Sequence, residues 1–136
     1  MPHPTARDLV QGLFKRIGEG ASPEQIAELF SEDIDWYIAG DLARVPWIGR
    51  KKGRAGVAEF YQQIREQVTS ERFEVSAILG DDQRAVALGS LASRVNATGK
   101  LIETEFAFDI RTEGELIVRC HMLEDSHAVA QALIAD

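Results

Sequence analysis

The sequence predicts an α+β fold in which three helices pack in the concave face of a strongly curved, mainly antiparallel sheet. Two observations predict it. Apolar residues recur at helical spacing in three segments of the N-terminal half, whereas from about residue 72 onward they alternate with polar residues, as in strands. The long strands can bury the apolar stripes of the helices only by curling around them, which gives a conical barrel with an open mouth.

The N-terminal half contains two helix starts and one strand. Thr5 is suited to cap a helix that runs to about Ile17. Ser22, Pro23 and Gln25 match a capping box with proline at the first helical position, which predicts a second, short helix. A strand follows at residues 33–38, where every second residue is apolar. Its apolar residues are Ile34, Trp36 and Ile38.

The rest of the chain predicts a third helix and four long strands. After an irregular stretch at 40–53, apolar residues at helical spacing are Val57, Phe60, Tyr61, Ile64 and Val68. The strands are expected at 72–79, 84–96, 101–111 and 115–124, with turns at "GDDQ", "ATGK" and "TEGE". Asp125 or Ser126 can cap a short C-terminal helix. Because there is no linker, repeat or low-complexity tract, residues 1–136 are expected to form one domain.

Composition limits the classes of partner. The chain has 15 Lys+Arg against 22 Asp+Glu, and the net charge of −7 disfavours nucleic acid and anionic membranes. No apolar run reaches the roughly 18 residues that span a bilayer, and the first residues lack the apolar core of an export signal. A single cysteine cannot form an internal disulfide. We therefore expect a cytoplasmic protein.

Several stretches resemble the SnoaL-like proteins of the nuclear transport factor 2-like superfamily, which includes ketosteroid isomerases and limonene-epoxide hydrolases. They are the run "LFSEDIDWYIAG…VPWIGRKKGRAGVAEFY" and the segment "GELIVRCHMLEDSHAVAQAL". The resemblance covers nearly the whole chain, and its motifs mark the fold more than the chemistry. It implies a conical sheet around a deep pocket for a small hydrophobic molecule, often in a homodimer.

The catalytic positions of these relatives are mostly lost. By the resemblance, the general-base aspartate of the ketosteroid isomerases falls at Ile38, their oxyanion tyrosine at Phe14 and their protonated aspartate near Phe108. The last-strand aspartate of the cyclases and epoxide hydrolases falls at Met122. Only the tyrosine of "EFY" is present, as Tyr61. Because Ile38 cannot abstract a proton and Phe14 cannot stabilise an oxyanion, ketosteroid isomerase chemistry is not expected.

The segment "RCHMLED" places Cys120 beside His121. Neighbouring strand residues point to opposite faces, so the two cannot form a nucleophile–base pair. Two registers remain open for the last hairpin. A three-residue loop at 112–114 opposes Phe108 to Val118 and turns Cys120 and Met122 inward, and this is the preferred register. A two-residue loop at 113–114 would instead turn Ile117, Arg119 and His121 inward.

Other polar residues are candidates for the site. A two-residue turn at 98–99 would oppose Ser93 to Thr104 on the inner face, either as a self-satisfied hydroxyl pair or as a handle for a ligand. The same turn opposes Arg94 to Glu103 on the outer face. Ala92, Ala107 and Leu123 are expected to be exposed on that face. The basic run "GRKKGR" lacks the ending of a phosphate loop and is interpreted as a solvated turn.

No metal or cofactor is expected, because His3, His121 and His127 lack the spacing of metal ligands and no cofactor motif is present. The expected ligand-binding residues are Phe14, Trp36, Ile38, Trp47 at the pocket rim, Tyr61, Phe106, Phe108 and Met122. Weaker catalytic candidates are Tyr61, Ser93, Thr104 and Glu124.

Three functions stay open from the sequence. The first is an isomerase, cyclase or hydrolase that uses nonstandard residues. The second is a noncatalytic ligand-binding domain, which the missing acid and base favour. The third is a protein-interaction module that uses the outer face of the sheet.

Overall fold

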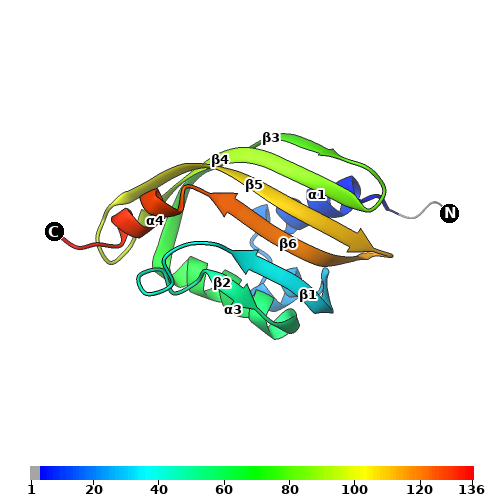
Figure 1. Ribbon diagram of the computed structural model, residues 1–136, viewed down its shortest axis with the longest axis horizontal. Helices are drawn as coiled ribbons and strands as arrows, with labels where there is room; N and C mark the ends of the chain where they lie inside the picture. The colour runs from blue at the N-terminus through cyan, green and yellow to red at the C-terminus, as the bar shows by residue number, and fades with distance from the viewer. Residues whose placement is uncertain (1–3) are drawn as a thin grey trace.

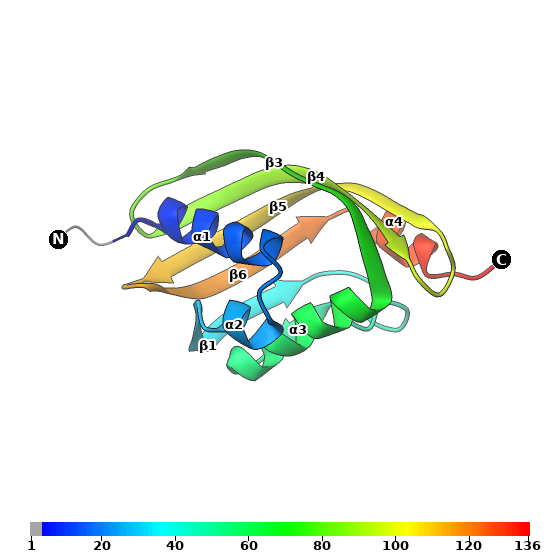
Figure 2. The same cartoon turned by 180° about the vertical axis from the view of Figure 1, so that it is seen from behind.

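A computed structural model describes residues 4–136. The elements in chain order are α1 (Ala6–Gly18), α2 (Pro23–Ala27), β1 (Phe30–Ile38), β2 (Gly49–Lys51), α3 (Gly53–Gln67), β3 (Val68–Gly80), β4 (Arg84–Val95), β5 (Leu101–Glu113), β6 (Leu116–Glu124) and α4 (Ser126–Ala132). Figure 1 looks onto the outer, convex face of a curled sheet. Figure 2, from behind, shows α1, α2 and α3 in front of its concave face, and α4 lies at the end that carries the C-terminus.

The helices begin where the sequence predicts. Thr5 accepts a hydrogen bond from the backbone of Asp8, and Ser22 accepts one from Gln25, so both predicted caps are confirmed. Asp125 caps α4 through the backbone of Ala128. No helix among residues 4–136 is long and apolar enough to cross a membrane.

The sheet confirms the predicted α+β class and adds one strand. Its order is β2-β1-β6-β5-β4-β3. Strand β1 runs parallel to β6, whereas all other neighbours are antiparallel. The added strand is β2, which falls in the basic run that the sequence analysis interprets as a solvated turn. That interpretation is wrong, because Lys51 donates to Glu59 at 2.7 Å and Arg54 donates to the Phe30 carbonyl at 2.7 Å.

The last hairpin has neither of the two predicted registers. Glu113 pairs with Leu116 around a two-residue Gly114–Glu115 loop, and Gly114 has φ +60°. Val118 then forms a bulge, because Thr112 pairs with Ile117 but Arg111 pairs with Arg119. Because Val118 is an extra residue in β6, the residues after it face the sides that the preferred register predicted. Phe108 therefore pairs with Met122 rather than with Val118, and Cys120 and Met122 still face inward.

The predicted register of the β4–β5 hairpin is also wrong. The loop has four residues, 96–99, so Ser93 pairs with Ile102 and Leu91 pairs with Thr104. Arg94 does not meet Glu103. Its guanidinium instead binds Glu71 at 2.7 Å. The sequence could not separate the two turns, because "NATGK" supplies glycine at a position that suits either of them.

One core fills the space between helices and sheet. Trp36 and Ile38 point into it as predicted, and Trp47, which was expected at a pocket rim, is buried as well. Ala92 was expected to be exposed on the outer face but is buried there, whereas Leu123 is exposed as predicted.

The facing of β6 can be tested by two neighbouring truncations. Met122 is 8% exposed and lies opposite Phe108, whereas Leu123 is 61% exposed. Met122→Ala should lower the free energy of unfolding by about 2–4 kcal/mol because it removes packed core atoms. Leu123→Ala should change it by less than about 0.5 kcal/mol in the monomer. Urea unfolding of both variants measures the difference, and equal losses would contradict the assigned facing.

Candidate ligand-binding site

Four phenylalanine rings pack together on the concave face beneath α1. Phe73 stacks on Phe106 with ring centroids 4.9 Å apart, and Phe106 meets Phe108 edge-on at 5.3 Å. Phe14 of α1 contacts both ends of this row, at 5.6 Å from Phe73 and 5.5 Å from Phe108. The set closes into a ring of contacts, which we call the α1 aromatic cluster.

The α1 aromatic cluster depends on a glycine and stays partly open. A Cβ atom at Gly89 would lie 2.6 Å from Phe106 and 2.0 Å from the Glu74 carbonyl, so only glycine leaves room for the ring there. Phe73 belongs to the inner row of the sheet yet is 44% exposed. Phe73, on the edge strand β3, is therefore the accessible ring of this cluster, whereas Phe106 and Phe108 are buried.

A second group of rings, the α3 aromatic cluster, lies between β1 and α3. Trp36 lies 4.9 Å from Phe60, 5.8 Å from Phe30 and 6.1 Å from Tyr61, measured between ring centroids. Burial raises the pKa of Tyr61, so its hydroxyl stays protonated. Phe60 and Tyr61 come from the "EFY" stretch of the sequence, which α3 turns toward the sheet.

Strand β6 carries Cys120, Met122 and Glu124 on its inner side. Burial raises the pKa of the Cys120 thiol to about 12, so the thiolate that a nucleophile requires does not form at neutral pH. His121 points to the convex face, where its Nε2 lies 2.9 Å from Asp35. The absence of a Cys120–His121 pair, predicted from strand alternation, is confirmed.

Glu124 lies at the inner end of β6, paired with Phe106. Burial, with a smaller contribution from the charge of Asp125, raises its pKa to about 7. Within residues 4–136 its carboxyl group forms no salt bridge or hydrogen bond. A carboxyl group with such a pKa exchanges its proton near neutral pH, which is the property that acid–base chemistry requires.

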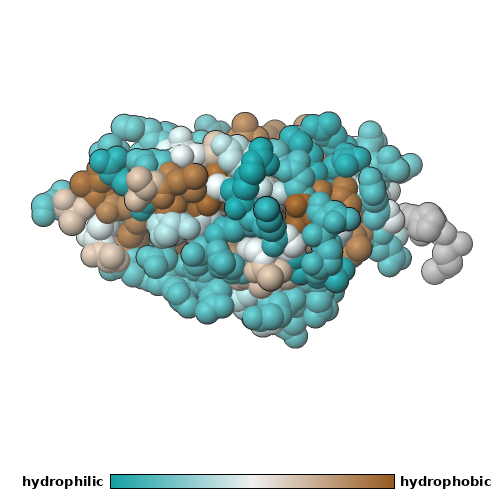
Figure 3. Space-filling model, turned by 60° about the horizontal axis from the view of Figure 1, so that its bottom comes forward, coloured by the Kyte–Doolittle hydropathy of each residue, from teal (hydrophilic) through white to brown (hydrophobic). Residues whose placement is uncertain are grey.

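The remaining sequence candidates do not meet at one point. Thr104 accepts a hydrogen bond from the backbone of Asp125 at 2.9 Å and donates to the Glu105 carbonyl, so its hydroxyl joins β5 to the start of α4. Ser93 lies two residues further along the inner row of β4, opposite Ile102. Trp47 lies in the loop between β1 and β2. At that end of the molecule Figure 3 shows a gathering of apolar side chains, and Leu42 is exposed there.

Charged groups gather on the convex face. Asp35 binds His121 and Arg119, and Asp109 binds Arg84 through two hydrogen bonds of 3.0 and 2.8 Å. The hydrogen bond from His121 holds the pKa of Asp35 below its ordinary value, and the hydrogen bond from Arg84 does the same for Asp109. Asp35 and Asp109 are thus paired with basic side chains, whereas Glu124, on the inner side of β6, forms no ion pair among the described residues.

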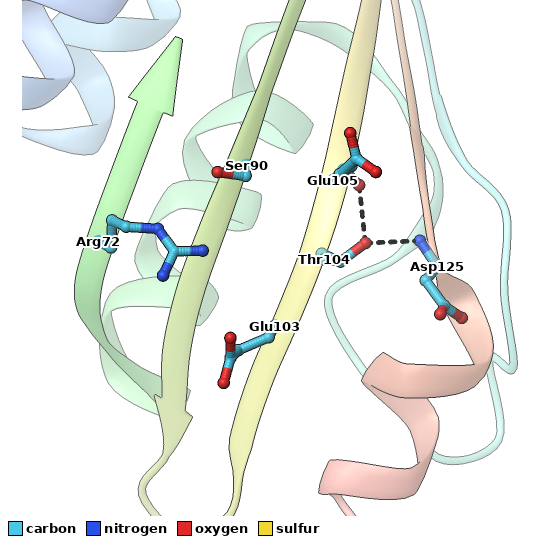
Figure 4. A pocket seen from close by; sticks show the side chains of 6 residues that line it. All are labelled: Arg72, Ser90, Glu103, Thr104, Glu105 and Asp125. Carbon is cyan, nitrogen blue, oxygen red and sulfur yellow. Dashed lines mark hydrogen bonds between the residues drawn. The ribbon is translucent and has the colours of Figure 1, made fainter. Parts of the chain in front are cut away.

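A polar groove of about 480 Å³ lies on the same convex face beside α4. Figure 4 shows Arg72 of β3 reaching across β4 toward Glu103, with Thr104 bonded to the start of α4. Arg72, Glu103 and Glu105 form no salt bridge within residues 4–136. Apolar residues cross the strands next to this groove in one row, in which the exposed Leu88 and Leu123 lie on either side of Ala107. Ala107 was expected to be exposed and is half-buried.

Sequence reasoning missed Phe73. The alternation "RFEVS" indicates a strand, but two bulges in β3 change which residues face inward, so the pattern alone does not assign Phe73 to the concave face. The described residues contain no cluster of three or more metal-ligating side chains. His3, one of the histidines considered in the sequence, lies outside the described residues.

Comparison with solved structures places the chain among proteins of this fold. An NTF2-like protein from Burkholderia xenovorans LB400 is 24% identical, with a TM-score of 0.86 over 98% of this chain and 99% of that one. TerC, co-crystallised with polyporic acid, is 16% identical, with a TM-score of 0.78 over 92% and 95% of the two chains.

A protein with a ketosteroid isomerase-like fold from Catenulispora acidiphila DSM 44928, in complex with trimethylamine, is 13% identical. Its TM-score is 0.69 over 87% of this chain and 85% of that one. At these identities the likeness concerns the fold alone. No curated protein matches the chain. The SnoaL-like domain family matches residues 10–120, and the chain therefore belongs to the SnoaL-like domain family.

Proposed function

We propose that the concave face binds a small, largely apolar organic molecule. The observation that carries this proposal is the exposed Phe73 ring, which lies on the concave face, stacks on Phe106 and leads to the unpaired carboxyl group of Glu124. Exposed aromatic surface next to a few polar groups is the usual composition of a small-molecule site. The proposed lining keeps the sequence candidates and adds Phe73, and consists of Phe14, Trp36, Ile38, Trp47, Tyr61, Phe73, Phe106, Phe108 and Met122.

Two solved structures with this fold support the proposal by their contents. TerC was co-crystallised with polyporic acid, and the Catenulispora acidiphila protein holds trimethylamine. Both are small organic molecules, although they share little chemistry. The fold therefore accommodates different ligands, and this chain's own side chains have to select its ligand.

A catalytic version of the same proposal rests on Glu124. A carboxyl group with a pKa of about 7 can donate or accept a proton at neutral pH, as an isomerase, cyclase or hydrolase requires. Glu124 lies two residues beyond Met122 and on the same side of β6. Met122 is where the last-strand aspartate of related enzymes falls, so Glu124 offers a carboxyl group one pair of residues further along that strand.

A second copy of the chain is proposed as a partner on the convex face. The apolar centre of this contact is the row of Leu88, Ala107 and Leu123. Arg72 lies beside Glu103 and Glu105 in the neighbouring groove but forms no ion pair with either of them. Around a twofold axis, Arg72 of each copy can meet Glu103 or Glu105 of the other. The arrangement is isologous, because one surface supplies both partners.

The binding proposal predicts a selective effect of Phe73. Phe73→Ser should weaken the binding of the neutral fluorescent probe N-phenyl-1-naphthylamine by about two- to tenfold, because a stacked aromatic pair contributes about 0.5–1.5 kcal/mol. Leu79→Ser serves as the control, since Leu79 is also exposed but lies on the convex face. Fluorescence titration measures both affinities. An equal effect of the two substitutions would contradict the site.

Glu124 predicts a dependence of stability on pH. Its pKa is about 7 in the folded protein against an ordinary 4.5, so the folded state binds the proton more tightly. The associated stability is fully present below about pH 4.5 and is lost as the pH rises to about 7. Relative to Glu124→Gln, the protein should lose roughly 3 kcal/mol across this interval. Urea unfolding at both ends measures it, and a pH-independent difference between the two proteins would exclude the raised pKa.

The proposed dimer can be tested with charged substitutions. Sedimentation at micromolar concentration should give a dimer, and Leu88→Glu together with Leu123→Glu should give a monomer, because the two copies would bring like charges into an apolar contact. Leu42→Glu is the matched control, since Leu42 is as exposed as Leu123 but lies outside the sheet. A monomeric parent protein would refute the interface.

A further inference from the structure

The pairing of β5 with β6 ends at Glu124. Phe106 and Glu124 are the last pair of the ladder, and α4 begins two residues later, at Ser126. The residue between them, Asp125, lies beyond the ladder, and its backbone N–H group donates to the Thr104 hydroxyl at 2.9 Å (Figure 4). A buried side chain therefore takes the place of the ladder at the corner between strand and helix.

The Thr104 hydroxyl is fully used by contacts with the backbone. It also donates its own proton to the Glu105 carbonyl at 2.7 Å, and the residue is only 8% exposed. A hydroxyl group has one proton to donate, so Thr104 cannot also donate to a ligand. Thr104 therefore acts on its surroundings through the two backbone groups that it binds.

The carboxyl group of Glu124 has no bond of its own that would fix its position. It forms no hydrogen bond or ion pair within the described chain, so its placement depends on the backbone. Glu124 itself pairs with Phe106, and the next residue is held by Thr104. Asp125 also caps α4 by accepting a hydrogen bond from the backbone of Ala128 at 3.0 Å. One residue thus joins the end of the strand to the start of the helix.

We propose that Thr104 is the positioning residue of Glu124, and that its hydrogen bond to the Asp125 backbone keeps the Glu124 carboxyl group on the concave face beside Phe106. Without the hydroxyl group the corner at Asp125 is free to turn. A carboxyl group without partners then moves toward water, where its charge is better solvated. The inference rests on the proposed function in its catalytic form, in which Glu124 transfers the proton.

The pKa of Glu124 reports where its carboxyl group lies, and the ¹³C resonance of that group gives this pKa during a pH titration. In the parent protein burial raises the pKa to about 7. Thr104→Val keeps the size of the side chain and removes the hydroxyl group. It should lower the pKa of Glu124 by at least about 1, toward the ordinary 4.5. Thr104→Ser retains a hydroxyl group and should keep the pKa near the parent value.

Thr98 provides a matched control, because its hydroxyl group makes the same kinds of contact at the far end of α4. It donates to the Ala132 carbonyl at 2.6 Å and accepts from the backbone of Lys100 at 3.2 Å. Thr98→Val should therefore loosen α4 but leave the pKa of Glu124 unchanged. An equal fall of this pKa in Thr98→Val and Thr104→Val would assign the effect to a general loosening of the helix and overturn the proposal.

A second pair of variants tests the same hydrogen bond from its other side, which keeps the test decisive if Thr104→Val does not fold. Asp125→Pro removes the backbone N–H group, and the φ of −75° at this position is compatible with proline. Asp125→Ala removes the same carboxylate and helix cap but keeps the N–H group. The pKa of Glu124 should be lower in Asp125→Pro than in Asp125→Ala by at least about 1.

The outcomes separate this inference from the proposed function. An ordinary pKa of Glu124 in the parent protein, an unchanged pKa in Thr104→Val or equal values in the two Asp125 variants would each overturn the role of Thr104, whether or not an apolar probe binds. Failure of N-phenyl-1-naphthylamine to bind the parent protein would instead refute the apolar site, and the titration would still decide whether Thr104 positions Glu124.

Discussion

The double pairing of β6 determines which side chains form the interior of this protein. β6 runs parallel to β1 on one side and antiparallel to β5 on the other, so its own facing has to agree with both neighbours. The bulge at Val118 makes this agreement possible. It allows Ile117 and Cys120, three residues apart, to point to the same side, where regular alternation would separate them. Met122 and Glu124 follow on that side, and His121 is left to the convex face.

From this constraint follows a separation of neutral and charged groups. The concave side has aromatic rings, neutral donors and a carboxyl group that burial keeps partly protonated, because a charge is costly there. The convex side has paired charges, in which Asp35 and Asp109 are held ionised by His121, Arg119 and Arg84. We propose that the first environment binds the apolar ligand. The proposed contact with a second copy of the chain lies on the convex side.

The start of α4 fixes the environment of Glu124. Thr104 binds the backbone of Asp125, and at the far end of α4 the Thr98 hydroxyl donates to the Ala132 carbonyl at 2.6 Å. Lys100 adds a hydrogen bond to the Ile134 carbonyl. The helix is thus tied at both ends to β5 and to the turn before it. Glu124 precedes this anchored segment directly, and burial at this position, with a smaller contribution from the charge of Asp125, raises the pKa of its carboxyl group.

The sequence by itself determined what depends on short-range chemistry. The caps at Thr5 and Ser22 follow from side chains that bond the backbone three residues away, and the inward facing of Trp36 and Ile38 follows from alternation within one strand. The fold class followed from these periods. Opposite faces for Cys120 and His121 also needed only the geometry of a strand.

Tertiary structure decided everything that depends on how one strand is aligned with another. Loop length decides the partners of Ser93, Thr104 and Arg94, and "NATGK" and "TEGEL" each permit several loops of similar energy. Inserted residues decide the bulge at Val118 and the inward position of Phe73. The unpaired state of the Trp36 indole and the raised pKa of Glu124 depend on packing from α3 and α4. No local pattern encodes them, because burial is a property of the assembled chain.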